Sequence, residues 1–223
     1  MFAPGHRRSL PPILPEGRGR KTSERPELLR ESEVLRLNPN TGLMDGARHS
    51  LCPHRDARPP GSDVSLLVLH AISLPPGEFG GTAIEDLFFG RLDPSAHPYF
   101  RRLADLRVSA HFLVRRDGEL VQFVSVLERA WHAGESEFRG RAACNDYSVG
   151  LELEGDAATP FTDRQYNQAC AAITALRDGL PSLRSAPVVG HSDIAPGRKW
   201  DPGQTFDWAR LAAGLARAGE RDK

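Results

Sequence analysis

The sequence VSLLVLH (residues 64–70) is the clearest sign of the fold, because it is apolar apart from one serine and ends in His70. The turn-forming sequence SLPPGEFGG (residues 73–81) follows it after two residues. A short apolar run bounded by glycine and proline is typical of a strand in the middle of a sheet. We therefore expect a buried strand that runs into a loop, with His70 directly after its apolar part.

Further along the chain, alternating apolar and polar residues predict more strands. RVSAHFLVRRDGELVQFV (residues 107–124) indicates two strands joined by a hairpin around Asp117-Gly118. SVGLELEG (residues 148–155) also alternates, so Glu152 and Glu154 should lie on the face opposite to its leucines.

Two helix starts are marked by the spacing of a capping box. Thr82 and Glu85 precede a short helical pattern, and Thr162 and Gln165 precede a long one that glycine and proline end. FDWARLAAGLARAG (residues 206–219) predicts a final amphipathic helix. We therefore expect a short helix, a long helix packed on the sheet, and a C-terminal helix.

These elements predict the fold class and the domain organisation. APVVGHSD (residues 186–193) is one more short strand that ends in histidine. Strands and helices mixed with one hairpin imply an α/β fold, with a mixed central β-sheet flanked by helices. At 223 residues the chain fits a single domain, which we place at residues 35–223. Residues 1–34 are basic and carry five prolines, so we expect a disordered arm there.

Composition excludes several classes of partner. The chain carries 29 basic and 29 acidic side chains, so no net charge steers it towards nucleic acid or a membrane surface. No apolar run is long enough for a membrane helix, and the N-terminus lacks the apolar core of a signal peptide. Three cysteines are too few and odd for a disulfide framework. We expect a cytoplasmic protein with no nucleic-acid partner, no membrane association and no obligate protein partner.

Three residues near strand ends suggest a metal site. His70 and His191 each follow an apolar strand, and Asp201 comes ten residues after His191 in a loop rich in glycine and proline. Open α/β sheets commonly bind ligands at strand ends. Two imidazoles and one carboxylate form the ligand set of a catalytic zinc ion, with the fourth position left to water. Spacing alone also permits the alternative that both histidines are structural.

Six segments, in the same order along the chain, resemble the AmpD family of cytoplasmic 1,6-anhydro-N-acetylmuramyl-L-alanine amidases. Several exceed ten residues, and together they span most of the predicted domain. The segments are HAISLPPGEFGG (70–81), AHP (96–98), RVSAHFLVRRDG (107–118), RAWHAG (129–134), CNDYSVGLELEG (144–155) and GHSDIAPGRKWDPG (190–203).

The resemblance implies a fold, a cofactor and a reaction. The fold is the amidase domain shared with peptidoglycan recognition proteins, and the cofactor is Zn²⁺ bound by His70, His191 and Asp201. The reaction is hydrolysis of the amide bond between the lactyl group of 1,6-anhydro-N-acetylmuramic acid and L-alanine. The family's catalytic pair falls on Glu152 and Lys199, as general base and oxyanion stabiliser respectively.

The resemblance also implies how a small anhydromuropeptide would be held. Arg107 and Arg198 lie in family motifs, and an arginine fork binds carboxylates such as those of a stem peptide. Trp131 is expected to pack on the sugar or the peptide, with ordinary core packing as the alternative. The chain departs from the family pattern at Ala71, where asparagine is usual, and at Ala143, where arginine is usual. Both departures bear on substrate preference.

Two other functions remain open from the sequence. One is a binding module without zinc, although modules of this kind typically lose a ligand and here all three ligand positions are filled. The other is an autolysin that acts on the intact wall, which would call for export and usually a wall-binding repeat. Two further residues of the motifs, His111 and His132, are interpreted as structural or as partners of the ligands. Cys144 is interpreted as an ordinary buried residue, because a zinc amidase needs no thiol nucleophile.

Overall fold

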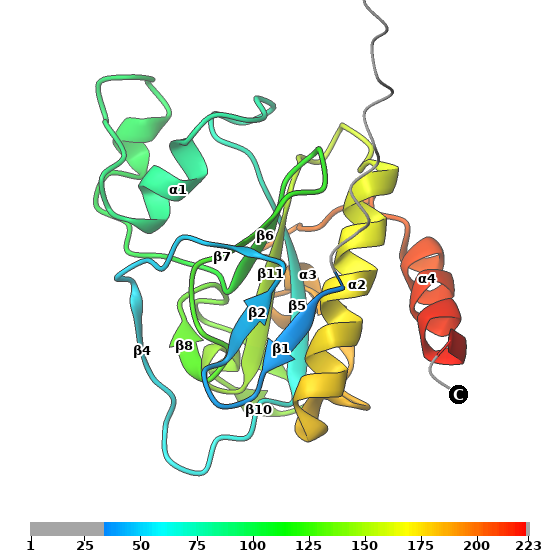
Figure 1. Ribbon diagram of the computed structural model, residues 1–223. Helices are drawn as coiled ribbons and strands as arrows, with labels where there is room; N and C mark the ends of the chain where they lie inside the picture. The colour runs from blue at the N-terminus through cyan, green and yellow to red at the C-terminus, as the bar shows by residue number, and fades with distance from the viewer. Residues whose placement is uncertain (1–33, 222–223) are drawn as a thin grey trace, which may run out of the picture. The chain divides into compact units, whose positions relative to one another are not determined.

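The computed structural model describes residues 34–221, and its core is a six-stranded sheet in the order β12-β5-β11-β6-β7-β3 (Figure 1). Every neighbouring pair is parallel except β6 and β7, which are antiparallel. The strands are β3 (Arg48–His49), β5 (Leu66–Ile72), β6 (Phe112–Val114), β7 (Leu120–Gln122), β11 (Ser148–Glu154) and β12 (Val188–Gly190). The predicted mixed α/β fold is confirmed.

Shorter elements surround this sheet. Three two-stranded ribbons pair β1 (Arg36–Asn38) with β2 (Leu43–Asp45), β4 (Arg55–Ala57) with β8 (Glu128–Ala130), and β9 (Glu137–Phe138) with β10 (Arg141–Ala142). The helices are α1 (Ala83–Phe88), α2 (Asp163–Gly179), α3 (His191–Ile194) and α4 (Trp208–Arg221), with 3₁₀ turns η1 (Phe100–Arg102), η2 (Cys144–Asp146) and η3 (Pro181–Leu183). The predicted arm, apart from Val34, lies outside the described residues.

Helix α2 covers one face of the sheet, and α4 lies beside α2 (Figure 1). Side chains of a strand alternate between faces, so Leu67 and Leu69 of β5 share this side with Leu151 and Leu153 of β11. These leucines belong to one buried cluster with Ile173 and other apolar residues of α2. Every second residue of the two central strands therefore packs against α2, and the residues between them point to the opposite face.

The opposite face has a different cover on each half of the sheet. Over β6 and β7, Leu113 and Val121 pack with Phe88 of α1 and Phe100 of η1. Over β5, Leu66 and its neighbours pack with residues of η2 and α3. The space between the two covers is where the polar side chains of β5 and β11 emerge.

Both the hairpin and the long helix follow the sequence prediction. The β6–β7 hairpin turns at Gly118, whose φ of 90° lies in the left-handed region that glycine adopts without strain. At the start of α2, the hydroxyl of Thr162 accepts from the backbone N–H of Gln165, and the Gln165 side chain accepts from the N–H of Thr162. The predicted capping box of α2 is confirmed.

The capping box predicted for α1 is wrong, although the helix exists. The Thr82 hydroxyl donates to the carboxylate of Asp86 and does not accept from a backbone N–H of the helix. The carboxylate of Glu85 accepts from Arg48, Ser50 and Arg115. Two guanidinium groups bind this carboxylate more strongly than one backbone N–H would, so the side chain points towards them.

The end of β5, the strand predicted from VSLLVLH, also differs from its prediction. β5 continues through His70 to Ile72, because β11 pairs with it up to Glu154. His70 therefore lies within a central strand and projects from its face, and does not emerge at the strand's end. None of the helices within residues 34–221 is long and apolar enough to cross a membrane.

Candidate active site

Three neighbouring elements bring His70, His191 and Asp201 together. His70 projects from β5 on the face opposite to α2, since it alternates with Leu69. His191 is the first residue of α3, directly after β12, which is the parallel neighbour of β5. The loop after α3 folds back, and its Asp201 carbonyl accepts from the backbone N–H of Ser192 at 3.0 Å. The pairing of β12 with β5 therefore places His191 next to His70, and the loop after α3 adds Asp201.

The three side chains direct one donor atom each at a common point. Nδ1 of His70 lies 2.9 Å from Nδ1 of His191 and 3.2 Å from Oδ2 of Asp201. Nδ1 of His191 lies 3.1 Å from the same oxygen. A tetrahedral zinc ion with bonds of about 2.0–2.1 Å separates its ligand atoms by roughly 3.3 Å. These three atoms, called here the triangle, therefore fit a metal ion both in their spacing and in their chemical type.

The protonation states of the site also suit a cation. Burial lowers the pKa of His70 to about 4, and the hydrogen bond with Asp201 offsets only part of this shift. Burial alone would raise the pKa of Asp201, but the adjacent imidazole rings of His191 and His70 hold it well below the ordinary value. At neutral pH His70 is therefore neutral and Asp201 is ionised, which is the form in which each binds a metal.

Glu152 stands next to this triangle. It pairs with His70 in the register of β11 and β5, and its side chain points to the same face. It is 9% exposed, and its Oε2 atom has no hydrogen-bond partner among residues 34–221. Burial raises its pKa well above the ordinary value, the charge of Asp201 raises it further, and Lys199 lowers it in part.

The second glutamate of the same strand is bound by its neighbours. Glu154 accepts from the backbone N–H of Gly80 at 2.6 Å and of Arg116 at 3.1 Å. It also pairs with the guanidinium of Arg115 at 3.4 Å. The carboxylate of Glu154 is thus used to hold two loops, whereas that of Glu152 remains available for chemistry.

A cavity of about 470 Å³ opens over the triangle and Glu152. Ala71 lines it directly, whereas Ala143 is exposed and lies outside it. The volume of this cavity is in the range of small-molecule sites. The wall away from the triangle is largely apolar and includes Leu74, Leu87, Phe88, Tyr99, Leu103, Leu106 and Val108.

The remaining predicted residues differ in their distance from this cavity. Lys199, Arg198 and the half-buried Trp131 line it. The Nη2 group of Arg198 donates to the carbonyl of Ala133 at 2.7 Å and to the carbonyl of Glu135. Arg107 does not line the cavity, and its guanidinium donates to carbonyls of its own loop. The structure therefore brings all the predicted site residues together except Arg107.

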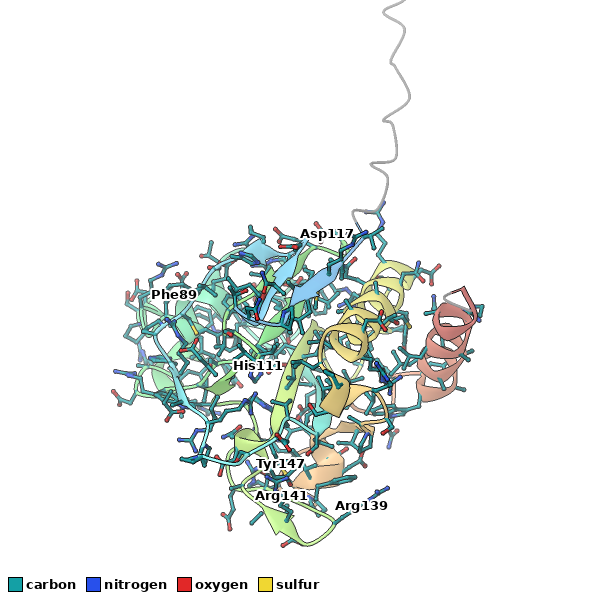
Figure 2. All side chains as sticks on the ribbon, turned by 60° about the horizontal axis from the view of Figure 1, so that its bottom comes forward. Phe89, His111, Asp117, Arg139, Arg141 and Tyr147 are labelled. Atoms are coloured by element: carbon teal, nitrogen blue, oxygen red, sulfur yellow. The ribbon has the colours of Figure 1, made fainter. Side chains whose placement is uncertain are left out.

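Two residues of the motifs, His132 and Ser148, make further contacts with the site. The ring of His132 contacts His70, and Ser148 contacts His132 in turn. His111, labelled in Figure 2, instead bonds the backbone, because its Nδ1 accepts from the N–H of Gly150 at 3.0 Å. Only the position of His132 and Ser148 within motifs hinted at their contacts, since no spacing rule predicts them.

Comparison with known proteins relates the chain to a family of amidases. Residues 60–204 match the family described as N-acetylmuramoyl-L-alanine amidase. The chain is 55% identical over 170 residues to the 1,6-anhydro-N-acetylmuramyl-L-alanine amidase AmpD of Escherichia coli K12, which covers 76% of this chain and 92% of that protein.

Solved structures agree with this relationship. A crystal structure of a selenomethionine derivative of AmpD is 53% identical, with a TM-score of 0.76 over 78% of this chain and 97% of that one. AmpDh3 from Pseudomonas aeruginosa, in complex with anhydromuramic pentapeptide, is 28% identical, with a TM-score of 0.50 over 70% of this chain and 61% of that one.

The family match covers every residue of the site. The triangle, Glu152 and Lys199 all lie within residues 60–204. The similarity to AmpD also extends over nearly the whole length of the relatives, in sequence and in structure. The chain therefore belongs to the N-acetylmuramoyl-L-alanine amidase family and, within it, to the AmpD amidases.

Proposed function

We propose that the chain is a zinc-dependent enzyme that hydrolyses the amide bond between the lactyl group of 1,6-anhydro-N-acetylmuramic acid and L-alanine in peptidoglycan fragments. One observation carries this proposal: the buried carboxylate of Glu152, whose Oε2 has no hydrogen-bond partner among residues 34–221, stands beside three donor atoms that fit a metal ion. Amide hydrolysis by a metal enzyme needs this combination of a cation and a nearby base.

Zinc is proposed because two imidazole nitrogens and one carboxylate oxygen form a typical catalytic zinc set. His70, His191 and Asp201 would hold the ion. When bound, zinc supplies a Lewis acid that activates water and polarises the amide carbonyl. The low pKa values of His70 and Asp201 support the assignment, because neither group needs to lose a proton at neutral pH.

Glu152 is proposed as the group that moves the proton. It would take a proton from the attacking water and deliver it to the leaving nitrogen of L-alanine. Its buried position supports this role, because burial raises the affinity of the carboxylate for the proton that it must carry between the two steps. Glu154 has no such freedom, since its oxygens already accept from Gly80 and Arg116.

Lys199 is proposed to stabilise the negative charge that develops on the carbonyl oxygen. It is the only lysine within residues 34–221, where all other basic long side chains are arginines. A lysine ammonium is a compact point charge on a flexible stem, which suits a charge that appears only in the transition state. Donors in such positions typically contribute about 3–4 kcal/mol.

The substrate is proposed to be a small anhydromuropeptide that fills the cavity. Trp131 would cover its sugar or peptide, and Arg198 would donate to a stem carboxylate from Nη1, which makes no hydrogen bond within residues 34–221. Arg107 lies outside the cavity, so its contact is proposed only for peptides long enough to leave it. The anhydromuramic pentapeptide bound to the Pseudomonas relative supports this substrate class.

The proposed place of action is the cytoplasm, on soluble fragments of the recycled cell wall. This location is the one that the resemblance to the AmpD family implies, and the similarity to AmpD over most of both chains is the ground for the proposal. The cavity volume of about 470 Å³ also suits a compact glycopeptide, whereas a glycan strand would have to extend out of it.

The test is mass spectrometry of anhydromuramyl tripeptide after incubation with the pure protein. We expect release of the tripeptide, its loss after chelation and its return on addition of zinc. Glu152→Gln and Lys199→Met should keep their zinc, measured by elemental analysis, and lose about 10²–10³-fold in rate. Full activity in protein shown to be free of metal would refute the zinc mechanism.

A further inference from the structure

The side of His70 that faces away from the triangle begins a chain of hydrogen bonds. Its Nε2 lies 2.9 Å from Nδ1 of His132. Nε2 of His132 lies 3.1 Å from the hydroxyl of Ser148, which donates to the carbonyl of Cys144 at 2.6 Å. All four residues are buried, so water does not replace these partners.

The carbonyl of Cys144, at the end of this series of hydrogen bonds, determines which atom donates in each of them. A carbonyl oxygen only accepts, so the single proton of the Ser148 hydroxyl is used on Cys144. Ser148 must then accept from Nε2–H of His132, which leaves a lone pair on Nδ1 of His132. That lone pair accepts from Nε2–H of His70. Nδ1 of His70 therefore presents a lone pair to the triangle, as a metal ligand must.

The other histidine is oriented from the same segment. Nε2 of His191 lies 3.2 Å from the carbonyl oxygen of Ala133, which leaves Nδ1 of His191 as an acceptor. The side-chain oxygen of Asn145 accepts from the backbone N–H of His132 at 3.1 Å and of Ala133 at 2.8 Å. One segment of two residues thus faces both histidines and is held by one amide.

The turn η2, which contains Cys144 and Asn145, is anchored by the residue that follows it. The hydroxyl of Tyr147 donates to the carbonyl of Arg141 at 2.7 Å, and the Arg141 guanidinium lies over the Tyr147 ring at 3.8 Å. Figure 2 shows these two residues together beside the β9–β10 hairpin. Cys144, Asn145 and Ser148 lie in the segment that this contact holds in place.

We propose that His132 and Ser148 are positioning residues that fix the tautomer of His70, and that the carbonyl of Ala133 does the same for His191. This arrangement, called here the tautomer relay, sets the affinity of the site for zinc. The inference rests on the proposed zinc site and adds residues that do not touch the metal. Loss of such an outer partner typically weakens metal binding about 10–100-fold.

The test compares two buried serines that make the same kinds of bond. Ser148 accepts from His132 and donates to a carbonyl, and Ser125 accepts from the N–H of Leu127 and donates to the carbonyl of Thr41. Zinc affinity is measured by competition with a chromophoric chelator. We expect Ser148→Ala to bind zinc at least about tenfold more weakly than wild type, and Ser125→Ala to match wild type.

Replacement of His132 adds a rescue that a purely structural role would not show. His132→Asn keeps an acceptor close to the position of Nδ1, so it should stay within a few fold of wild-type zinc affinity. His132→Leu removes the acceptor and should lose about 10–100-fold. Equal losses in both variants would overturn the relay.

A second readout does not depend on the variants folding. ¹⁵N NMR of the histidine rings in the zinc-free wild-type protein should show the proton on Nε2 of both His70 and His191. A proton on Nδ1 of His70 would overturn the relay, as would equal zinc affinities of Ser148→Ala and Ser125→Ala. A wild-type protein that binds no zinc would overturn the proposed function together with it.

Discussion

Replacing Gly150 with alanine tests how tightly the site is packed against the sheet. Gly150 lies in the middle of β11, and a Cβ atom there would meet the ring of His132 at 2.5–2.8 Å. Ordinary contacts begin near 3.4 Å, so the ring would have to move by almost 1 Å. It cannot do so without lengthening its 2.9 Å hydrogen bond to His70.

The expected loss of stability follows from two opposing terms. The alanine restricts the unfolded chain, which stabilises the protein by about 0.4–1 kcal/mol where the backbone tolerates it. Overpacking of a dense interior costs about 1–3 kcal/mol, and a weakened hydrogen bond costs about 1 kcal/mol more. Packing therefore dominates, and Gly150→Ala should lower the free energy of unfolding by about 1–3 kcal/mol.

The assay is urea unfolding in the presence of a chelator, so that zinc binding does not contribute to the measured stability. A double-mutant cycle with His132→Ala isolates the contact, because the same alanine should cost nothing once the ring is absent. A loss of equal size in both backgrounds would show that the clash lies elsewhere. Wild-type stability of Gly150→Ala would refute the packing argument altogether.

Three further outcomes are expected. Asp201→Ala should lower the zinc content measured by elemental analysis, because the site then keeps only two ligands. Hydrogen bonds from Arg48 lead the groups that lower the pKa of Glu85 from 4.5 to about 2, so its contribution is full above pH 4.5 and disappears as pH falls towards 2. Compared with Glu85→Gln in urea titrations, the wild type should lose about 1–2 kcal/mol more over this range, a figure reduced for partial exposure. Chromatography of released peptides should show much faster cleavage of anhydromuramyl tripeptide than of intact sacculi, because a cavity of about 470 Å³ suits a compact glycopeptide better than a polymer.

The sequence was sufficient to predict the sheet and the three metal-ligand candidates. An apolar run identifies a central strand, and alternation in β11 correctly assigns Glu152 and Glu154 to the face opposite to α2. Periodicity reports only which residues a strand buries. It could not predict that β5 continues through His70, because that depends on pairing with β11 across a long stretch of sequence.

Long-range polar contacts account for most of what the sequence left open. Glu85 fits the pattern of a capping box, but Arg48 and Arg115 reach it from other parts of the chain. Arg107 and Arg198 looked equivalent as carboxylate binders, and only the fold shows that one lines the cavity and the other does not. For Glu85 a local pattern is overridden by charged groups that the fold brings close, whereas Arg107 differs from Arg198 in its place relative to the cavity.

The two glutamates of β11 show why a motif alone cannot assign a catalytic role. They lie two residues apart on the same face of one strand, so the alternation of the strand does not distinguish them. Glu154 reaches the loops of Gly80 and Arg116, whose N–H groups bind its carboxylate. Glu152 lies closer to the triangle, opposite His70 in the strand register. The ligand atoms beside it point at the proposed metal position, and its Oε2 has no hydrogen-bond partner within residues 34–221. The surrounding loops therefore bind Glu154 and leave Glu152 with a buried oxygen that has no partner within residues 34–221, which supports the catalytic role proposed for Glu152.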